Sequence, residues 1–157
     1  MSARPIAVRA TDLPVHVGTD YPAPHDVPCR TRRRHRLGDA FGLTQFGVNL
    51  LELPPGAWSS QRHWHERQDE LAYVLEGEVV LVTDEGETTL RSGMTAGFRA
   101  GARNGHHLVN RSDAVARVLE VGTRTVDEVA RYPGIDLIFR EHAGGAGYFN
   151  ADGRPVT

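Results

Sequence analysis

Short apolar segments, each ended by a turn, fill the middle of the chain and most constrain its fold. Between Leu43 and Val121, alternating or continuous apolar runs are interrupted by glycine, proline and aspartate. Short strands at such spacing are typical of an all-β sandwich or barrel. The strands that we expect are residues 43–53, 57–65, 70–76, 79–83, 88–90, 95–98, 106–110 and 114–121. Residues 76–78 and 84–87 form tight turns around glycine, which favours antiparallel pairing.

Four potential metal ligands lie in two clusters of the sequence. His63 and His65 are separated by one residue, so on a strand both imidazoles would project from the same face. Glu70 follows a polar turn and could reach the same point from the next strand, and His106 belongs to a later strand. Three imidazoles and a carboxylate suit a divalent ion of Fe, Mn, Ni, Zn, Co or Cu. We therefore expect one such ion in each chain.

Neighbouring side chains leave two of the ligand positions open. Glu66 and Asp69 are also acidic, so either could replace Glu70 or accept a hydrogen bond from a ligating histidine. His107 stands directly beside His106 and competes with it. The residue types therefore predict a metal centre but not a unique set of four ligands.

Flanking glycines extend the ligand residues into a longer pattern. It consists of Gly56, His63, His65, Glu70 and Gly77, followed by Gly93, Gly101, His106 and Asn110. Over residues 43–121 this pattern resembles the two motifs of the cupin superfamily. The first motif departs by one extra residue between Gly56 and His63. In the second, Arg99 stands where a proline is usual, and the loop before His106 is two residues longer than usual.

The resemblance implies a double-stranded β-helix, or jelly-roll barrel, that holds the metal ion. It implies Glu70 as the acidic ligand because of its spacing, and His106 because it lies four residues before Asn110. It also implies a homodimer packed sheet against sheet. The strands at 70–76 and 79–83 agree with this, since they are apolar on both faces and need cover. A monomer whose two ends wrap the sheet is the alternative.

The chain reads as one domain with three parts. Residues 1–40 are rich in proline and predict an extended arm with short edge strands. Residues 41–123 are the barrel, and residues 124–157 are a tail that packs on it. In this tail, Thr125 to Glu128 form a capping-box pattern that predicts a short helical turn, residues 136–140 predict a strand, and the glycine-rich remainder predicts irregular structure.

A basic run, Arg30 to Arg36, ends the proline-rich arm. Its five arginines could bind phosphate or a nucleic acid, but we favour a solvated or partner-facing strip. The net charge of −2 argues against a general nucleic-acid binder. No segment has the roughly 20 apolar residues of a membrane span. We therefore expect neither a nucleic acid nor a membrane as a partner.

The numbers of cysteine and lysine residues limit the possible catalytic chemistry and indicate the cellular compartment. The single cysteine, Cys29, cannot form an internal disulfide, and we expect a small buried or semi-buried residue there. All 18 basic side chains are arginine, which excludes a Schiff base or a lysine general base. Without a signal-like apolar segment, we expect a cytoplasmic protein.

Strand alternation predicts the lining of the cavity. Ser59 and Gln61 should share the face of the histidines, Ala72 and Val74 that of Glu70, and Leu108 and Asn110 that of His106. This lining would be small and mostly apolar, which suits a modest organic ligand. Trp58 and Trp64 fall on the opposite face, so we expect core or interface aromatics there, and Tyr73 should also serve packing.

Four protein ligands leave two positions free on an octahedral ion, which is enough for catalysis. We expect a small metalloenzyme, either a dioxygenase or an isomerase of sugars or sugar phosphates. The alternative is a non-catalytic protein that binds or senses a small ligand. Because the family implied by the resemblance hosts all of these chemistries, the fold does not choose among them.

Overall fold

The computed structural model describes residues 4–157, so the first three residues of the expected arm lie outside it. The strands are β1 (Val15–Val17), β2 (Arg33–Arg36), β3 (Phe46–Leu53), β4 (Trp64–His65), β5 (Glu70–Glu76), β6 (Glu78–Thr83), β7 (Gly86–Arg91), β8 (Thr95–Phe98), β9 (His106–Val109), β10 (Ala116–Thr123), β11 (Val129–Arg131), β12 (Ile138–His142), β13 (Gly145–Phe149) and β14 (Pro155–Val156). The helices are α1 (Leu37–Phe41) and two 3-10 turns, Ala10–Asp12 and Val27–Cys29. Within these residues no helix is long and apolar enough to cross a membrane.

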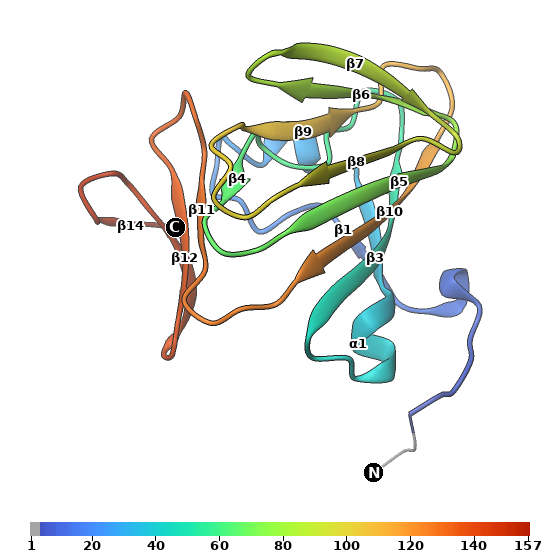
Figure 1. Cartoon of the computed structure of the whole chain (residues 1–157), viewed down its shortest axis with the longest axis horizontal. Coiled ribbons are helices and arrows are strands. Elements are labelled where there is room, and N and C mark those ends of the chain that lie inside the picture. Colours follow the sequence, from blue (N-terminus) through green and yellow to red (C-terminus); the bar gives the residue numbers. More distant parts are fainter. Residues whose placement is uncertain (1–3) are drawn as a thin grey trace.

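The strands form three antiparallel sheets that together make a jelly roll. The largest has the order β1-β2-β3-β10-β5-β8, and the sheet β7-β6-β9 lies over it (Figure 1). The third sheet, β14-β13-β12-β11-β4, stands at one end (Figure 1). This arrangement confirms the expected all-β double-stranded β-helix.

The main core lies between the first two sheets. It contains Leu51, Leu53, Ala57, Ala72, Val74, Val79, Leu90, Leu108, Ala116 and Val118. On β5 the alternation is regular, because Ala72 and Val74 face this core while Leu71, Tyr73 and Leu75 are exposed. The tight turn at Gly77 requires glycine for two reasons. Its φ is +78°, and a Cβ at this position would lie 3.1 Å from the Ala116 Cα.

The expected strand at residues 57–65 is wrong. Only Trp64–His65 form a strand, and the preceding residues are a bent segment held by isolated bridges from Trp58 to Val109 and from His63 to His106. The bend arises because the amide groups bond to several different segments: Trp58 donates to the Pro28 carbonyl and Ser59 to the Leu108 carbonyl.

The region after residue 124 also differs from the expectation. Thr125 to Glu128 form no helical turn, and the backbone at Asp127 has a φ of +59°. The glycine-rich stretch expected to be irregular forms β13 and β14, in which β13 pairs with β12 on one side and with β14 on the other. Tyr148 of β13 and Val156 of β14 pack into a second apolar cluster with Ala130, Tyr132 and Leu137.

Cys29 is fully buried, as expected, and burial raises the pKa of its thiol to about 11. A chromogenic disulfide reagent at pH 8 should therefore react with the native protein at least about 100-fold more slowly than with the denatured protein. The denatured protein should release one equivalent, and Cys29→Ser should release none. Rapid labelling of the native protein would contradict the buried position.

Candidate metal centre

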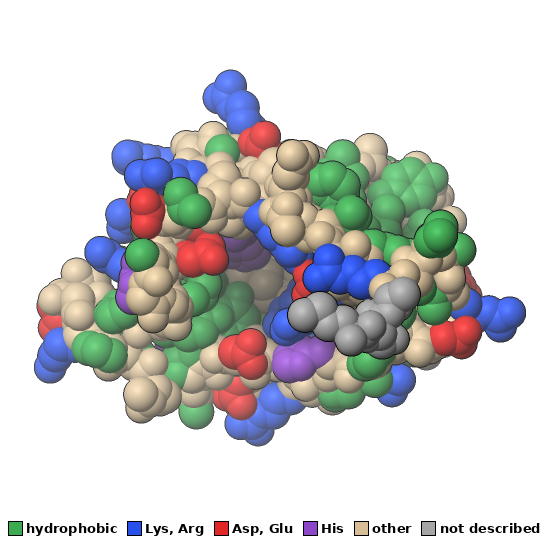
Figure 2. Space-filling model, turned by 90° about the horizontal axis from the view of Figure 1, so that it is seen from below, with side chains coloured by type: hydrophobic (Ala, Val, Ile, Leu, Met, Phe, Trp, Pro, Cys, Tyr) green, Lys and Arg blue, Asp and Glu red, His purple; other side chains and the backbone are tan. Residues whose placement is uncertain are grey.

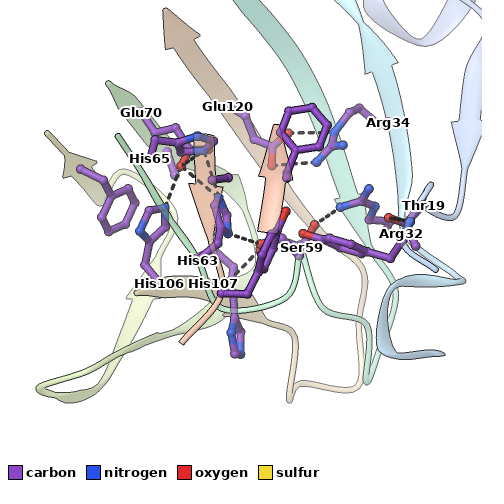
Figure 3. A pocket seen from close by; sticks show the side chains of 18 of the residues that line it. Thr19, Arg32, Arg34, Ser59, His63, His65, Glu70, His106, His107 and Glu120 are labelled. Atoms are coloured by element: carbon purple, nitrogen blue, oxygen red, sulfur yellow. Dashed lines mark hydrogen bonds and ion pairs between the residues drawn. The ribbon is translucent and has the colours of Figure 1, made fainter. Parts of the chain in front are cut away.

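Three imidazoles converge on the carboxylate of Glu70. Glu70 Oε2 lies 2.7 Å from His106 Nε2, 3.3 Å from His65 Nε2 and 3.4 Å from His63 Nε2. The Nε2 atoms of His63 and His65 are 3.1 Å apart. These separations match neighbouring ligand atoms around one ion with bonds of about 2.1 Å. His63, Glu70 and His106 each offer a ligand atom within 4.8 Å of the others, and His65 Nε2 contacts two of these three residues. This donor set fits a divalent transition metal, and Figure 3 shows the side chains gathered together.

The other ring nitrogen of each histidine faces an oxygen. His63 Nδ1 lies 2.8 Å from the Gln61 carbonyl oxygen and His106 Nδ1 lies 3.4 Å from that of Asn104. His65 Nδ1 lies 3.3 Å from Glu128 Oε1. Such contacts orient imidazoles with Nε2 toward an ion. The cluster thus has the outer contacts that metal-ligating histidines need.

Glu128 takes the supporting role that the sequence suggested for Glu66 or Asp69. Its carboxylate is buried and also accepts hydrogen bonds from the amide N–H groups of Glu66 and Arg67, at 3.0 and 3.1 Å. The Glu66 side chain instead pairs with Arg131, and Asp69 accepts the Ala100 amide. Neither therefore takes part in the histidine cluster.

His107 points away from the cluster. Figure 3 shows its ring apart from the other three histidines. This ring stacks on Trp58, with centroids 4.5 Å apart, and burial lowers its pKa to about 4. His106 instead stacks on Phe98 and reaches Glu70. The alternation of β9 separates the two adjacent histidines, because successive residues of a strand face opposite sides.

Charge is strongly coupled within the cluster. Burial opposes ionisation of Glu70, but hydrogen bonds from His106, His63 and His65 hold its pKa well below the usual range. Burial likewise disfavours protonation of His65, yet Glu128 and Glu70 together raise its pKa to about 9. Burial lowers the pKa of His106. An anionic centre surrounded by imidazoles is suited to bind a cation.

A pocket of about 280 Å³ opens beside the cluster and is more polar than expected. Ser59, Ala72 and Leu108 line it as predicted, whereas Gln61, Val74 and Asn110 do not. Gln61 is turned aside by the bend and donates to the His25 carbonyl, and Asn110 donates to two main-chain carbonyls in the core. The molecule is visibly hollowed on this side (Figure 2).

The basic run supplies two residues of this pocket, so the expectation of a solvated or partner-facing strip is wrong for Arg32 and Arg34. The other three arginines of the run, Arg30, Arg33 and Arg36, are exposed. Arg32 and Arg34 line the pocket, and Arg34 donates to both carboxylate oxygens of Glu120 at 2.9 and 3.2 Å (Figure 3). Arg33, between them, pairs instead with Glu52. β2 begins at Arg33, and burial alternates along Arg32, Arg33 and Arg34, because successive side chains of an extended segment face opposite sides.

Both ends of the chain contribute aromatic walls that the sequence did not predict. Tyr21 comes from the amino-terminal arm, and Tyr132, Phe139 and Tyr148 come from the carboxyl-terminal sheet. The rings of Tyr21 and Tyr132 are 5.6 Å apart and meet edge to face. Burial raises the pKa of Tyr148 to about 12 and that of Tyr132 well above its ordinary value, so both remain hydroxyl donors at neutral pH.

Comparisons with known proteins agree with this architecture. A family model for the cupin domain matches residues 49–122. A sugar phosphate isomerase of the cupin superfamily from Silicibacter pomeroyi is 45% identical, with 96% of each chain covered and a TM-score of 0.91. The chain belongs to the cupin superfamily. The four ligand candidates all lie within the residues that match the cupin domain: His63, His65, Glu70 and His106.

More distant cupins share less of the chain. A protein assigned provisionally as a sugar phosphate isomerase, from Acidithiobacillus ferrooxidans, is 27% identical, with 81% of each chain covered and a TM-score of 0.73. A protein predicted to be an oxalate decarboxylase, from Thermotoga maritima, is 19% identical over 76% of this cupin and 100% of its own chain, with a TM-score of 0.62. The latter supports the fold alone. No curated protein matches the sequence.

Proposed function

We propose that this cupin is a metal-dependent isomerase of a small sugar phosphate, with one divalent transition metal held by His63, His65, Glu70 and His106. The observation that carries the proposal is the convergence of three Nε2 atoms on Glu70 at the wall of a polar pocket. The relative at 45% identity over 96% of the chain, named as a sugar phosphate isomerase, supports this reaction class over a dioxygenase.

The pocket has side chains suited to proton transfer. A divalent ion would supply Lewis acidity that polarises a carbonyl group. Glu120 presents a half-buried carboxylate to the pocket, and its bidentate contact with Arg34 fixes its orientation. This carboxylate can accept the proton from the hydroxyl-bearing carbon next to the carbonyl and return it to the carbonyl carbon, while the proton of that hydroxyl group moves to the former carbonyl oxygen. Tyr132 and Tyr148 can donate hydrogen bonds to substrate oxygens.

The reaction is tested with protein reconstituted separately with Mn, Fe, Ni, Co, Cu and Zn. We expect aldose–ketose interconversion of phosphorylated sugars of three to six carbons, and a drop in kcat of roughly 100-fold or more in Glu120→Gln. Oxygen uptake without isomerisation would favour a dioxygenase. Tight binding of sugar phosphates without turnover by any metal form would favour a sensor.

We further propose a homodimer formed through the outer face of the largest sheet. Leu71, Tyr73 and Leu75 of β5 are each at least 38% exposed and form a continuous apolar row. Contiguous apolar side chains of this kind on a soluble protein mark interaction surfaces. A second copy packed sheet to sheet would cover the row, in agreement with the apolar pattern on both faces of this strand.

Disrupting this row should release monomers. Light scattering during size exclusion should give the mass of a dimer for the unaltered protein and of a monomer for Leu71→Glu/Leu75→Glu, because burying two unpaired carboxylates is costly. Val126→Glu is the control, since Val126 is exposed but lies outside the row. A monomer in the unaltered protein, or a dimer in the double variant, would contradict the proposed interface.

A further inference from the structure

Arg32 is a buried cation without an acidic partner. Its side chain lines the pocket although the residue is only 7% exposed. Nε donates to the Gly18 carbonyl at 2.8 Å, and Nη1 donates to the Ser59 carbonyl. Within residues 4–157, no carboxylate lies within salt-bridge distance of this guanidinium. A buried charge is costly unless it is paired, so the arrangement calls for an anion from outside the chain.

The neighbouring arginines of the run show the contrast. Arg34 faces the same pocket but is neutralised by Glu120, and Arg33 lies on the outer face with Glu52. The charge of Arg34 disfavours the cationic form of Arg32 further, since two like charges share one wall. Of these three residues, only Arg32 keeps an uncompensated charge beside the pocket.

The surroundings of Arg32 offer further donors. The Gly18 carbonyl that holds its Nε adjoins Thr19, and the amide of Tyr21 donates to the Thr19 hydroxyl at 3.3 Å. The ring of Tyr148 packs 5.5 Å from that of Tyr21. Figure 3 shows Arg32 and Thr19 together on the side of the pocket opposite the histidine cluster. Asp20 also lines the pocket, but its side chain is 80% exposed and lies at the surface.

We propose that Arg32 binds the phosphate group of the substrate and, with the hydroxyl groups of Thr19, Tyr21 and Tyr148, holds the other end of that molecule against the histidine cluster. This assignment rests on the proposed isomerase function and specifies which residue recognises the phosphorylated substrate. Guanidinium groups pair with phosphate through directed, charge-assisted hydrogen bonds. At about 280 Å³, the pocket has room for a small phosphorylated metabolite spanning both sites.

Calorimetry on the metal-loaded protein tests the assignment with fructose 6-phosphate, fructose and inorganic phosphate as probes. We expect fructose 6-phosphate and inorganic phosphate to bind, and fructose to bind at least roughly 10-fold more weakly. Arg32→Gln should raise the Kd for both phosphate-bearing probes by roughly 10- to 100-fold and leave the metal content unchanged. Arg33→Gln is the matched control, because Arg33 is adjacent in sequence but faces outward. This variant should bind both phosphate-bearing probes with the affinity of the unaltered protein. Equal affinity in Arg32→Gln would overturn the proposal.

A second measurement serves if Arg32→Gln does not fold. Crystals of the unaltered protein soaked in tungstate, a phosphate analogue visible by anomalous scattering, should show the anion within hydrogen-bond distance of Arg32. Tungstate found only at the histidine cluster, or absent from the pocket, would overturn the assignment. Failure of the isomerase proposal looks different: the anion then binds at Arg32 but no sugar phosphate is converted. Equal kcat/KM values for phosphorylated and unphosphorylated sugars would refute both the role of Arg32 and the phosphorylated substrate class, and would leave only isomerase activity standing.

Discussion

Replacing His63 and His65 together with alanine should abolish metal binding. The variant removes two of the four atoms that converge at one point, and the remaining pair, Glu70 and His106, makes a much weaker site. We expect the metal affinity to fall by more than about 100-fold, which exceeds the loss typical of removing a group that only orients a ligand. Metal analysis of protein purified without added metal, together with calorimetric titration, measures the effect.

His107→Phe is the matched control for this experiment. His107 adjoins a proposed ligand in sequence but stacks on Trp58, and phenylalanine can preserve that stacking. The control should keep a full complement of metal. Retention of the ion in the double variant, or its loss in His107→Phe, would show that the ligands lie elsewhere.

Replacing Glu128 with alanine should damage both stability and metal affinity. The carboxylate is almost fully buried and serves the amides of Glu66 and Arg67 as well as His65. Its removal leaves two amide groups without their acceptor, which should cost about 2–4 kcal/mol of unfolding free energy. Loss of the contact to His65 should weaken metal binding by roughly 10- to 100-fold. Denaturant unfolding of the metal-free protein measures the loss of stability separately from the loss of metal affinity.

Glu66→Ala provides the comparison. Glu66 is closer to the histidines in sequence, but its side chain is partly exposed and pairs with Arg131. Breaking such a pair should change the unfolding free energy by no more than about 1 kcal/mol. If Glu66→Ala proved as harmful as Glu128→Ala, the supporting role assigned to Glu128 would be wrong.

Local patterns predicted the fold and the proximity of the four ligand candidates. The spacing of His63 and His65 brought their Nε2 atoms together even though the expected long strand is a bend, because the last two residues of that segment still pair as β4. The spacing of four residues in the sequence between His106 and Asn110 correctly singled out His106, rather than His107, as the histidine that reaches Glu70. Turn signals and alternation likewise located most strands of the jelly roll.

The rest of the pocket depends on contacts between distant segments, which local patterns do not contain. Glu128 lies 63 residues from His65, and a capping-box interpretation of its neighbourhood obscured its role. No sequence motif marks the tyrosines that form the pocket wall. Only the basic run carried an overlooked signal, since treating Arg32 to Arg34 as a strand predicts one outward side chain between two inward ones.

Several residues of the pocket wall come from segments outside the matched cupin domain. Tyr21, Arg32 and Arg34 precede residue 49, and Tyr132 and Tyr148 follow residue 122. The four proposed ligands lie within that domain. Under the proposed function, the residues that would recognise the phosphate group and those that would bind the metal ion are encoded in separate parts of the gene. Relatives can diverge toward new substrates by changing the two ends of the chain while the centre that would perform the reaction stays intact.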